Sequence, residues 1–164
     1  MSTEEFFNRF EALTFDDVVI VPGYSDVLPD TVDTTATFAA DIVSGFDPNW
    51  VVLAGWMRIL SMSFLGWFPG MVVNLHPALP GELPGVDAIE RAWHEAQSGR
   101  RNQTGVMVHL VPNEGIDDGP VLATATVSIH PSDSLESLTN RVHGVEHRLL
   151  VETLATLCTT GANA

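Results

Sequence analysis

The chain has 164 residues, enough for one domain with a substantial core but too few for two ordinary domains. Hydrophobic residues make up 45% of the sequence, which favours a folded protein over a disordered one. The formal net charge is −14 and all seven basic residues are arginines, a balance that disfavours nucleic acid and anionic membranes as partners. Cys158 is the only cysteine, which excludes an intramolecular disulfide and fits a cytoplasmic location.

The first forty residues are weakly patterned. Residues 1–12 predict a short amphipathic helix, and Val18–Val21 predicts one strand, closed by Pro22-Gly23. The acidic start lacks the charged-then-apolar order of a signal peptide. The only membrane candidate is the apolar run at 50–73, but Arg58 and several glycines and prolines interrupt it. That run is therefore interpreted as two buried strands around a short helix.

From Trp50 onward, strands and helices alternate, which predicts an α/β sheet that is at least partly parallel. The expected strands are 50–55, 71–76, 104–111 and 120–129, and the expected helices are 57–68, 85–99 and 134–157. The continuous apolar run at 50–55 is typical of a buried strand covered on both faces. Ser134 is the expected N-cap of the last helix, and residues 159–164 are expected to be a disordered tail. The four tryptophans, Trp50, Trp56, Trp67 and Trp93, are interpreted as core or core-edge residues.

The segment "MVVNLHPALPGELPG", residues 71–85, places polar side chains where a buried strand meets a rigid loop. Because side chains alternate along a strand, Asn74 and His76 point to the same side. His109 lies near the end of the expected strand 104–111, and Asp117 lies in the segment after it. An amide, an imidazole and a carboxylate could support acyl transfer by stabilising an oxyanion and moving a proton; the carboxylate would keep the imidazole charged. The structural alternative is that Asn74 and His76 cap a loop, while the sequence around Asp117 is only a turn.

Four blocks carry a family resemblance, in order: "WVVLAGWMRILS", "NLHPALPGELPG", "TGVMVHLVPNEGIDDGPVL" and "RVHGVEHRLL". Over residues 40–157 they resemble phosphoribosylglycinamide formyltransferase. That family transfers a formyl group from 10-formyltetrahydrofolate to the amine of glycinamide ribonucleotide in purine synthesis. The resemblance implies an α/β fold with a partial formyltransferase-type, Rossmann-like sheet and flanking helices, without the usual N-terminal strands.

The same resemblance implies roles for individual residues. Asn74, His76 and Asp117 match the catalytic residues of the family, Glu146 matches a helix glutamate that contacts the amine substrate, and His109 matches a supporting histidine. The expected folate-lining residues are Met57, Arg58, Ile59, Leu60, Val111, Glu114 and Ile116. Gly115 looks like an insertion relative to some members, and Thr104 stands where some have histidine.

The sequence "HGVEH", residues 143–147, also matches the His-x-x-Glu-His pattern of inverted zincins. Histidines four residues apart on a helix can chelate zinc. Gly144 is a poor helical platform, however, and no third ligand is evident. The expectation is therefore that the protein holds no metal.

Residues 1–39 are interpreted as a separate leader. The stretch "LTFDDVVIVPGYSDVLPDTVDTTATF" resembles the extreme N-terminus of IMP dehydrogenase, a segment that carries no catalytic residues. No Gly-x-Gly loop for cradling a phosphate occurs before residue 45. The chain thus resembles a hybrid, in which a formyltransferase-like domain at 40–158 follows the leader.

Three functional hypotheses follow. The first is a folate-dependent formyltransferase acting on small molecules, in which the absent phosphate loop impairs catalysis. The second is a non-catalytic folate-binding or interaction module from a rearranged gene. The third is a related formyl-transfer enzyme that acts on another amine. In each case, an unpaired edge at strand 50–55 would need cover, from Val18–Val21 or from a second copy of the chain in a homo-oligomer.

Overall fold

The computed structural model describes residues 43–45, 48–56 and 58–160, all within one compact unit that comprises residues 35–164. The leader, its expected helix at 1–12 and its expected strand at Val18–Val21 lie outside the described residues, so those predictions stay predictions.

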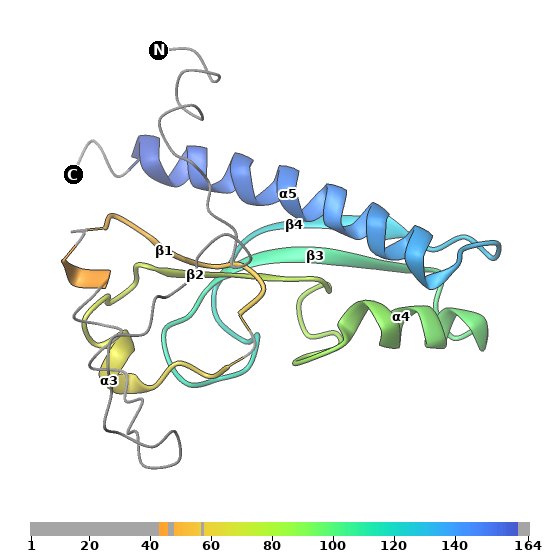
Figure 1. The fold of residues 1–164 in the computed structure, drawn as a ribbon, viewed down its shortest axis with the longest axis horizontal. Coiled ribbons are helices and arrows are strands. Elements are labelled where there is room, and N and C mark those ends of the chain that lie inside the picture. Colours follow the sequence, from red (N-terminus) through yellow and green to blue (C-terminus); the bar gives the residue numbers. More distant parts are fainter. Residues whose placement is uncertain (1–42, 46–47, 57, 161–164) are drawn as a thin grey trace, which may run out of the picture. The chain divides into compact units, whose positions relative to one another are not determined.

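Four strands form one mixed sheet in the order β1-β2-β3-β4 (Figure 1). Their bounds are β1 Val51–Leu53, β2 Val72–His76, β3 Gln103–Leu110 and β4 Val121–Ser128. β1 and β2 are parallel, whereas β2, β3 and β4 follow one another antiparallel. The prediction of an α/β sheet that is partly parallel is therefore confirmed.

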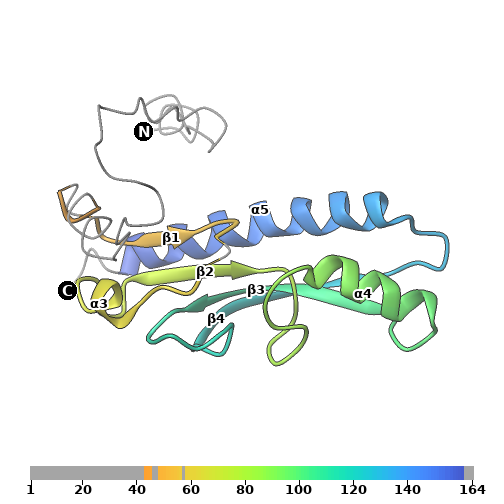
Figure 2. The same ribbon diagram turned by 60° about the horizontal axis from the view of Figure 1, so that its bottom comes forward.

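Three helices flank this sheet: α3 Met62–Leu65, α4 Ala88–Gln97 and α5 Leu135–Thr160. α5 runs along β3 and β4, and α4 packs against α5 and β3 (Figure 2). The Ser134 hydroxyl accepts a hydrogen bond from the Ser137 amide at 3.1 Å, which confirms Ser134 as the cap of α5. The indole Nε1 of Trp93 on α4 donates to the Asp133 carbonyl at 3.0 Å and ties α4 to the start of α5.

Hydrophobic side chains form two separate clusters. One joins α4 and α5 to the sheet, and its buried members are Ala78, Leu83, Ala88, Ala92, Val106, Val127, Ile129, Leu138 and Val142. The other surrounds α3, and its buried members are Leu53, Phe64, Leu65, Phe68 and Val72. Because strand residues alternate between faces, Leu75 of β2 packs against the first cluster and Val72 lies in the second. The polar residues of β2 then occur on the face of Val72.

The elements at 50–70 are shorter than the sequence predicts. The strand covers only Val51–Leu53, and Val52 is 36% exposed, so the prediction that both faces are buried is wrong for β1. Gly55, at φ +70°, takes the left-handed conformation that turns the chain away from the sheet. Trp56 and Trp67 are also exposed rather than core residues.

At the other end of the chain, α5 is longer than the sequence predicts. Thr159 and Thr160, expected in a disordered tail, belong to the helix. The Thr159 hydroxyl donates to the Ala155 carbonyl at 3.0 Å, so the polar side chain bonds within the helix.

β1 is an edge strand: β2 lies on one side, and no other strand of the described part pairs with its outer edge. A homo-oligomer formed through this edge stays a prediction. Within the described residues, no helix is long and apolar enough to cross a membrane.

Gly105 of β3 is expected to be intolerant of any side chain. A Cβ at this position would lie 2.6 Å from the Ala125 carbonyl oxygen and would collide with the Leu79 side chain. Gly105→Ala should lower the free energy of unfolding by about 1 to 3 kcal/mol in urea denaturation, because the strand and loop must separate. Gly144→Ala is the matched control: nothing lies within 4 Å of its added Cβ, and alanine favours a helix by roughly 0.5 to 1 kcal/mol. Equal effects of the two substitutions would contradict this packing.

Replacement of Thr104 with valine is expected to stabilise the protein. Its Oγ1 is buried and has no hydrogen-bond partner in the described part of the chain, and the residue is fully buried. Thr104→Val replaces an unsatisfied hydroxyl with a methyl group of similar shape and should raise the free energy of unfolding by about 1 kcal/mol. Thr104→Ser keeps the hydroxyl, loses a methyl group and should instead destabilise by about 1 kcal/mol. Thermal and urea unfolding of both variants measure the difference, and a destabilised valine variant would refute the account.

Candidate active site

Asn74 and His76 lie at the carboxyl end of β2, with one residue between them, and point to the same face of the sheet. Asn74 is half-buried and His76 is 4% exposed. Buried polar groups are stable only with partners, so the bonds of these side chains determine the geometry of the site.

His109 of β3 stands opposite Asn74 in the antiparallel register. Its Nδ1 lies 2.9 Å from the Leu110 carbonyl, so that nitrogen must carry the proton and donate. In the neutral ring, Nε2 is then the acceptor for the Asn74 amide Nδ2, at 3.1 Å. One N–H of Asn74 is thereby fixed toward His109.

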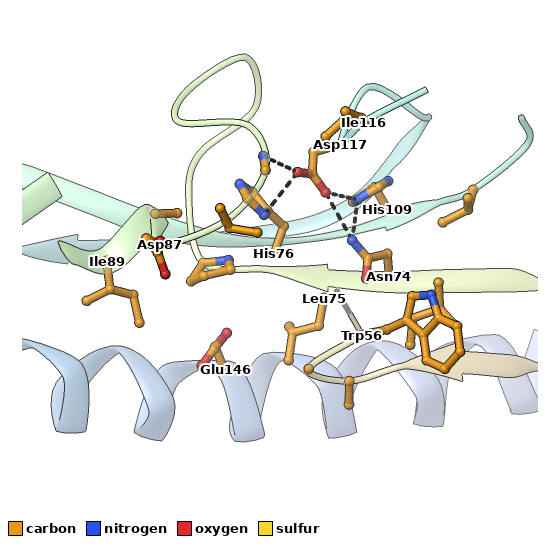
Figure 3. Close-up of a pocket in the computed structure, with 18 of the residues that line it drawn as sticks. Trp56, Asn74, Leu75, His76, Asp87, Ile89, His109, Ile116, Asp117 and Glu146 are labelled. Carbon is orange, nitrogen blue, oxygen red and sulfur yellow. Dashed lines mark hydrogen bonds and ion pairs between the residues drawn. The ribbon is translucent and has the colours of Figure 1, made fainter. Parts of the chain in front are cut away.

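Asp117 extends over this pair from the loop that joins β3 to β4 (Figure 3). Its Oδ1 accepts the other N–H of Asn74 at 3.1 Å and lies 3.5 Å from His109 Nε2. Its Oδ2 lies 3.3 Å from His76 Nδ1. Asp117 has φ +53°, an uncommon left-handed conformation for a residue other than glycine. One carboxylate thus joins the polar side chains of two strands.

The loop after β2 supplies two backbone groups to the same cluster. The Gly85 amide donates to Asp117 Oδ2 at 2.8 Å, and the Leu83 carbonyl lies 3.1 Å from His76 Nε2. Leu83 has φ +44°, so its carbonyl is held in a strained backbone conformation.

Two opposing effects decide the protonation of each group. Burial lowers the pKa of His76, and this outweighs the Asp117 carboxylate and the Leu83 carbonyl, which raise it. Burial raises the pKa of Asp117, but the nearby His109 ring, the Gly85 amide and the His76 ring together bring it below its ordinary value. The pKa of His76 therefore lies below its ordinary value, although its two ring nitrogens face the Asp117 carboxylate and the Leu83 carbonyl, two acceptors that favour the charged form. That the carboxylate keeps His76 charged stays a prediction.

A cavity of 860 Å³ borders this cluster, a volume that suits a small organic molecule. Asn74, His76, His109 and Asp117 all line it. Glu146 lines it as well, from α5, and Figure 3 shows its side chain across β2 from Asp117. Burial raises the pKa of Glu146, although His143 and His147 oppose this effect.

Most of the expected folate-lining residues also border this cavity. The segment that follows β1 lines the cavity with Arg58, Ile59 and Leu60. The β3–β4 loop lines it with Val111 and Ile116. Glu114 does not line it; instead its Oε1 accepts the Met62 amide at 2.8 Å and fastens that loop to the start of α3. Met57 lies outside the described residues.

The zinc alternative gains no support from the geometry of the helix. His143 Nε2 and Glu146 Oε2 are 3.8 Å apart. Among the residues that the structure describes, no group of three or more histidines, cysteines or carboxylates is placed to hold a metal ion.

The sequence does not single out every residue of the site. It does not identify the backbone groups of Leu83 and Gly85, because every residue has a carbonyl and the sequence does not show where it points. It also does not identify Trp56 and Asp87 as residues that line the cavity. The Pro84-Gly85 pair was the available signal, since it marks a turn directly before α4.

Comparison with known proteins identifies the family. The sequence profile described as formyl transferase matches residues 35–154. The chain belongs to the formyl transferase family. A phosphoribosylglycinamide formyltransferase of Dictyostelium discoideum is 45% identical over 114 residues, covering 66% of this chain and 55% of that protein. One of Mycobacterium tuberculosis H37Rv is 41% identical over 115 residues, covering 70% and 51%.

Solved structures agree with this family and this fold. Phosphoribosylglycinamide formyltransferase of Bacillus halodurans matches with a TM-score of 0.68 at 39% identity, covering 79% of this chain and 66% of that one. The Streptococcus pneumoniae enzyme matches with a TM-score of 0.70 at 30% identity, covering 79% and 71%. The chain spans about half the length of the curated relatives it matches.

The stabilising effect of Asp117 is expected to depend on pH. Because its pKa is lowered in the folded state, the ionised carboxylate stabilises the fold above the unfolded-state pKa of about 4, and this is lost as the pH falls through the folded-state pKa. Asp117→Asn should therefore lower the free energy of unfolding by about 1.5 to 3 kcal/mol at pH 7, with a deficit that shrinks toward pH 3. Urea unfolding at pH 7, 5 and 3 measures this.

The matched control is Asp118→Asn, at the exposed neighbouring residue, which should change stability by less than about 0.5 kcal/mol at each pH. A deficit of Asp117→Asn that is the same at pH 3 and pH 7 would show that ionisation of this carboxylate is not what stabilises the loop.

Proposed function

We propose that the protein transfers a formyl group from 10-formyltetrahydrofolate to the amine of glycinamide ribonucleotide. The single observation that carries this proposal is the meeting of Asn74, His76 and Asp117 at one cavity. Family membership adds the reaction class, and the names of the relatives cited above add the amine substrate.

In the proposed reaction, the amine nitrogen attacks the formyl carbon and the carbonyl electrons move onto oxygen. The N–H of Asn74 that now reaches Asp117 would donate to this oxygen in place of the carboxylate, while the other N–H stays bonded to His109. A protonated His76 would donate a second hydrogen bond to the oxygen, and the Asp117 carboxylate beside it stabilises the imidazolium.

The second half of the reaction breaks the bond between the formyl carbon and the folate nitrogen. The attacking amine must lose a proton and the folate nitrogen must gain one, so the net transfer needs a group that accepts and returns a proton. The ionised Asp117 is suited to this, directly or through water, because its pKa is below its ordinary value. Glu146, on the α5 side of the cavity, is proposed to hold the amine substrate.

The donor is proposed to occupy the part of the cavity between the segment after β1 and the β3–β4 loop. Ile59, Leu60, Val111 and Ile116 offer an apolar surface for a pterin ring. Arg58 offers a guanidinium for an anionic part of the donor.

A second candidate is folate binding without transfer. The observation that favours it is the apolar donor side of the cavity, which Ile59, Leu60, Val111 and Ile116 line. In this second candidate the folate occupies the same donor half of the cavity as in the first proposal, and no amine substrate is bound.

A direct assay separates the two candidates. Purified protein with both substrates should form tetrahydrofolate and the formylated ribonucleotide. His76→Ala should lower kcat by about 10² to 10⁴, and Asn74→Ala by about 10² to 10³, because each loses a group that contacts the reacting atoms. Binding of a folate analogue without turnover would support the second candidate.

The control is His130→Ala, an exposed histidine that does not line the cavity, which should leave kcat unchanged. If His76→Ala retains full activity, the catalytic assignment is wrong.

A further inference from the structure

The segment between β2 and α4, residues 77–87, holds the catalytic cluster through backbone atoms. Gly85 N–H donates to Asp117, and the Leu83 carbonyl faces His76. The position of those two atoms therefore depends on whatever fixes this segment. Because Leu83 has a strained φ of +44°, its conformation persists only if the neighbouring residues are held.

Two arginines hold the residues on either side of Leu83. After it, Arg91 of α4 donates to the Pro84 carbonyl at 2.8 Å. Before it, the Glu82 carboxylate forms a close ion pair with Nη1 of Arg101. Leu83 is thus bracketed by Glu82 and Pro84, each tied to a guanidinium.

Arg101 lies two residues before β3 and is itself firmly placed. Its Nε donates to Glu95 Oε2 of α4 at 2.8 Å, and its Nη1 reaches the Gln103 carbonyl at 3.3 Å. Its side chain is only 15% exposed. A guanidinium in this setting bonds several acceptors at fixed angles, which a lysine would not reproduce.

Neither Glu82 nor Arg101 lines the cavity, so neither is placed to contact a substrate there. Their effect on chemistry would have to pass through the backbone of Leu83 and Gly85. The other carboxylate partner of Arg101, Glu95, lies on α4 and has no such connection with the cluster.

We propose that Arg101 and Glu82 are positioning residues, whose ion pair fixes the 77–87 segment so that Leu83 and Gly85 orient His76 and Asp117. The proposal rests on the proposed function for its effect on turnover, but its effect on geometry is independent of that function.

The experiment compares Glu82→Ala with Glu95→Ala, which each remove one carboxylate partner of Arg101. In Glu82→Ala, amide exchange of Gly85, followed by NMR, should accelerate about tenfold, and the imidazole nitrogen signals of His76 should shift, as expected when a local opening becomes easier. Glu95→Ala should change the Gly85 exchange rate by less than about twofold and should leave the His76 nitrogen signals in place. If formyl transfer is present, Glu82→Ala should lower kcat about tenfold with an unchanged KM, because the reacting groups are misplaced rather than removed.

Further variants keep the proposal falsifiable. Glu82→Asp retains the charge on a shorter side chain and should give an intermediate Gly85 exchange rate. In the double variant with Glu82→Ala and Arg101→Ala, Gly85 should exchange no faster than in the more affected single variant, because both substitutions break the same ion pair between Glu82 and Arg101. Equal Gly85 exchange in Glu82→Ala and Glu95→Ala would overturn the proposal. A protein without formyl transfer that still shows the selective change at Gly85 would refute the proposed function and leave this inference standing.

Discussion

The structure depends most on one buried carboxylate. Asp117 is the point where three separate segments meet: it accepts hydrogen bonds from Asn74 on β2 and Gly85 before α4, while it belongs to the β3–β4 loop. A carboxylate has about four acceptor positions, so one residue can hold several donors at once. Its desolvation is compensated only when those donors are present, and this makes the arrangement of the three segments mutually dependent. The site is consequently a product of tertiary contacts rather than of any one segment.

That dependence explains where the strain in the backbone occurs. Of the three described residues other than glycine that have positive φ, two belong to the polar cluster: Leu83 directs a carbonyl at His76, and Asp117 carries the carboxylate. Such conformations are kept only where surrounding bonds determine them, and at these two residues the bonds are those of the polar cluster. Val106 and Val142 of the first hydrophobic cluster, in contrast, pack from a regular strand and a regular helix.

The sequence predicts the parts of the fold that arise from local patterns. The apolar alternation of β2 and the amphipathic pattern of α4 are properties of consecutive residues, and both elements were predicted within a few positions. The exposure of Val52 in β1 was not predicted, because a continuous apolar run does not show which face of the strand lacks cover. For the site, period-2 geometry correctly placed Asn74 and His76 on one face. The approach of His109 depends on antiparallel register, and that of Asp117 on a left-handed loop residue, neither of which a single sequence displays.

The charge of the chain constrains how an anionic ligand could be held. With a net charge of −14, the surrounding field opposes a phosphate or a carboxylate, so local donors must outweigh it. Among the described residues that line the cavity, Arg58 carries the only guanidinium, whereas Asp87, Glu90, Asp117 and Glu146 contribute carboxylates. A positively charged or neutral amine therefore suits the Glu146 side of the cavity electrostatically, and an anionic group suits only the region near Arg58. The amine of the proposed acceptor and the anionic part of the proposed donor fit this asymmetry, whereas the phosphate of the ribonucleotide would need donors other than Arg58.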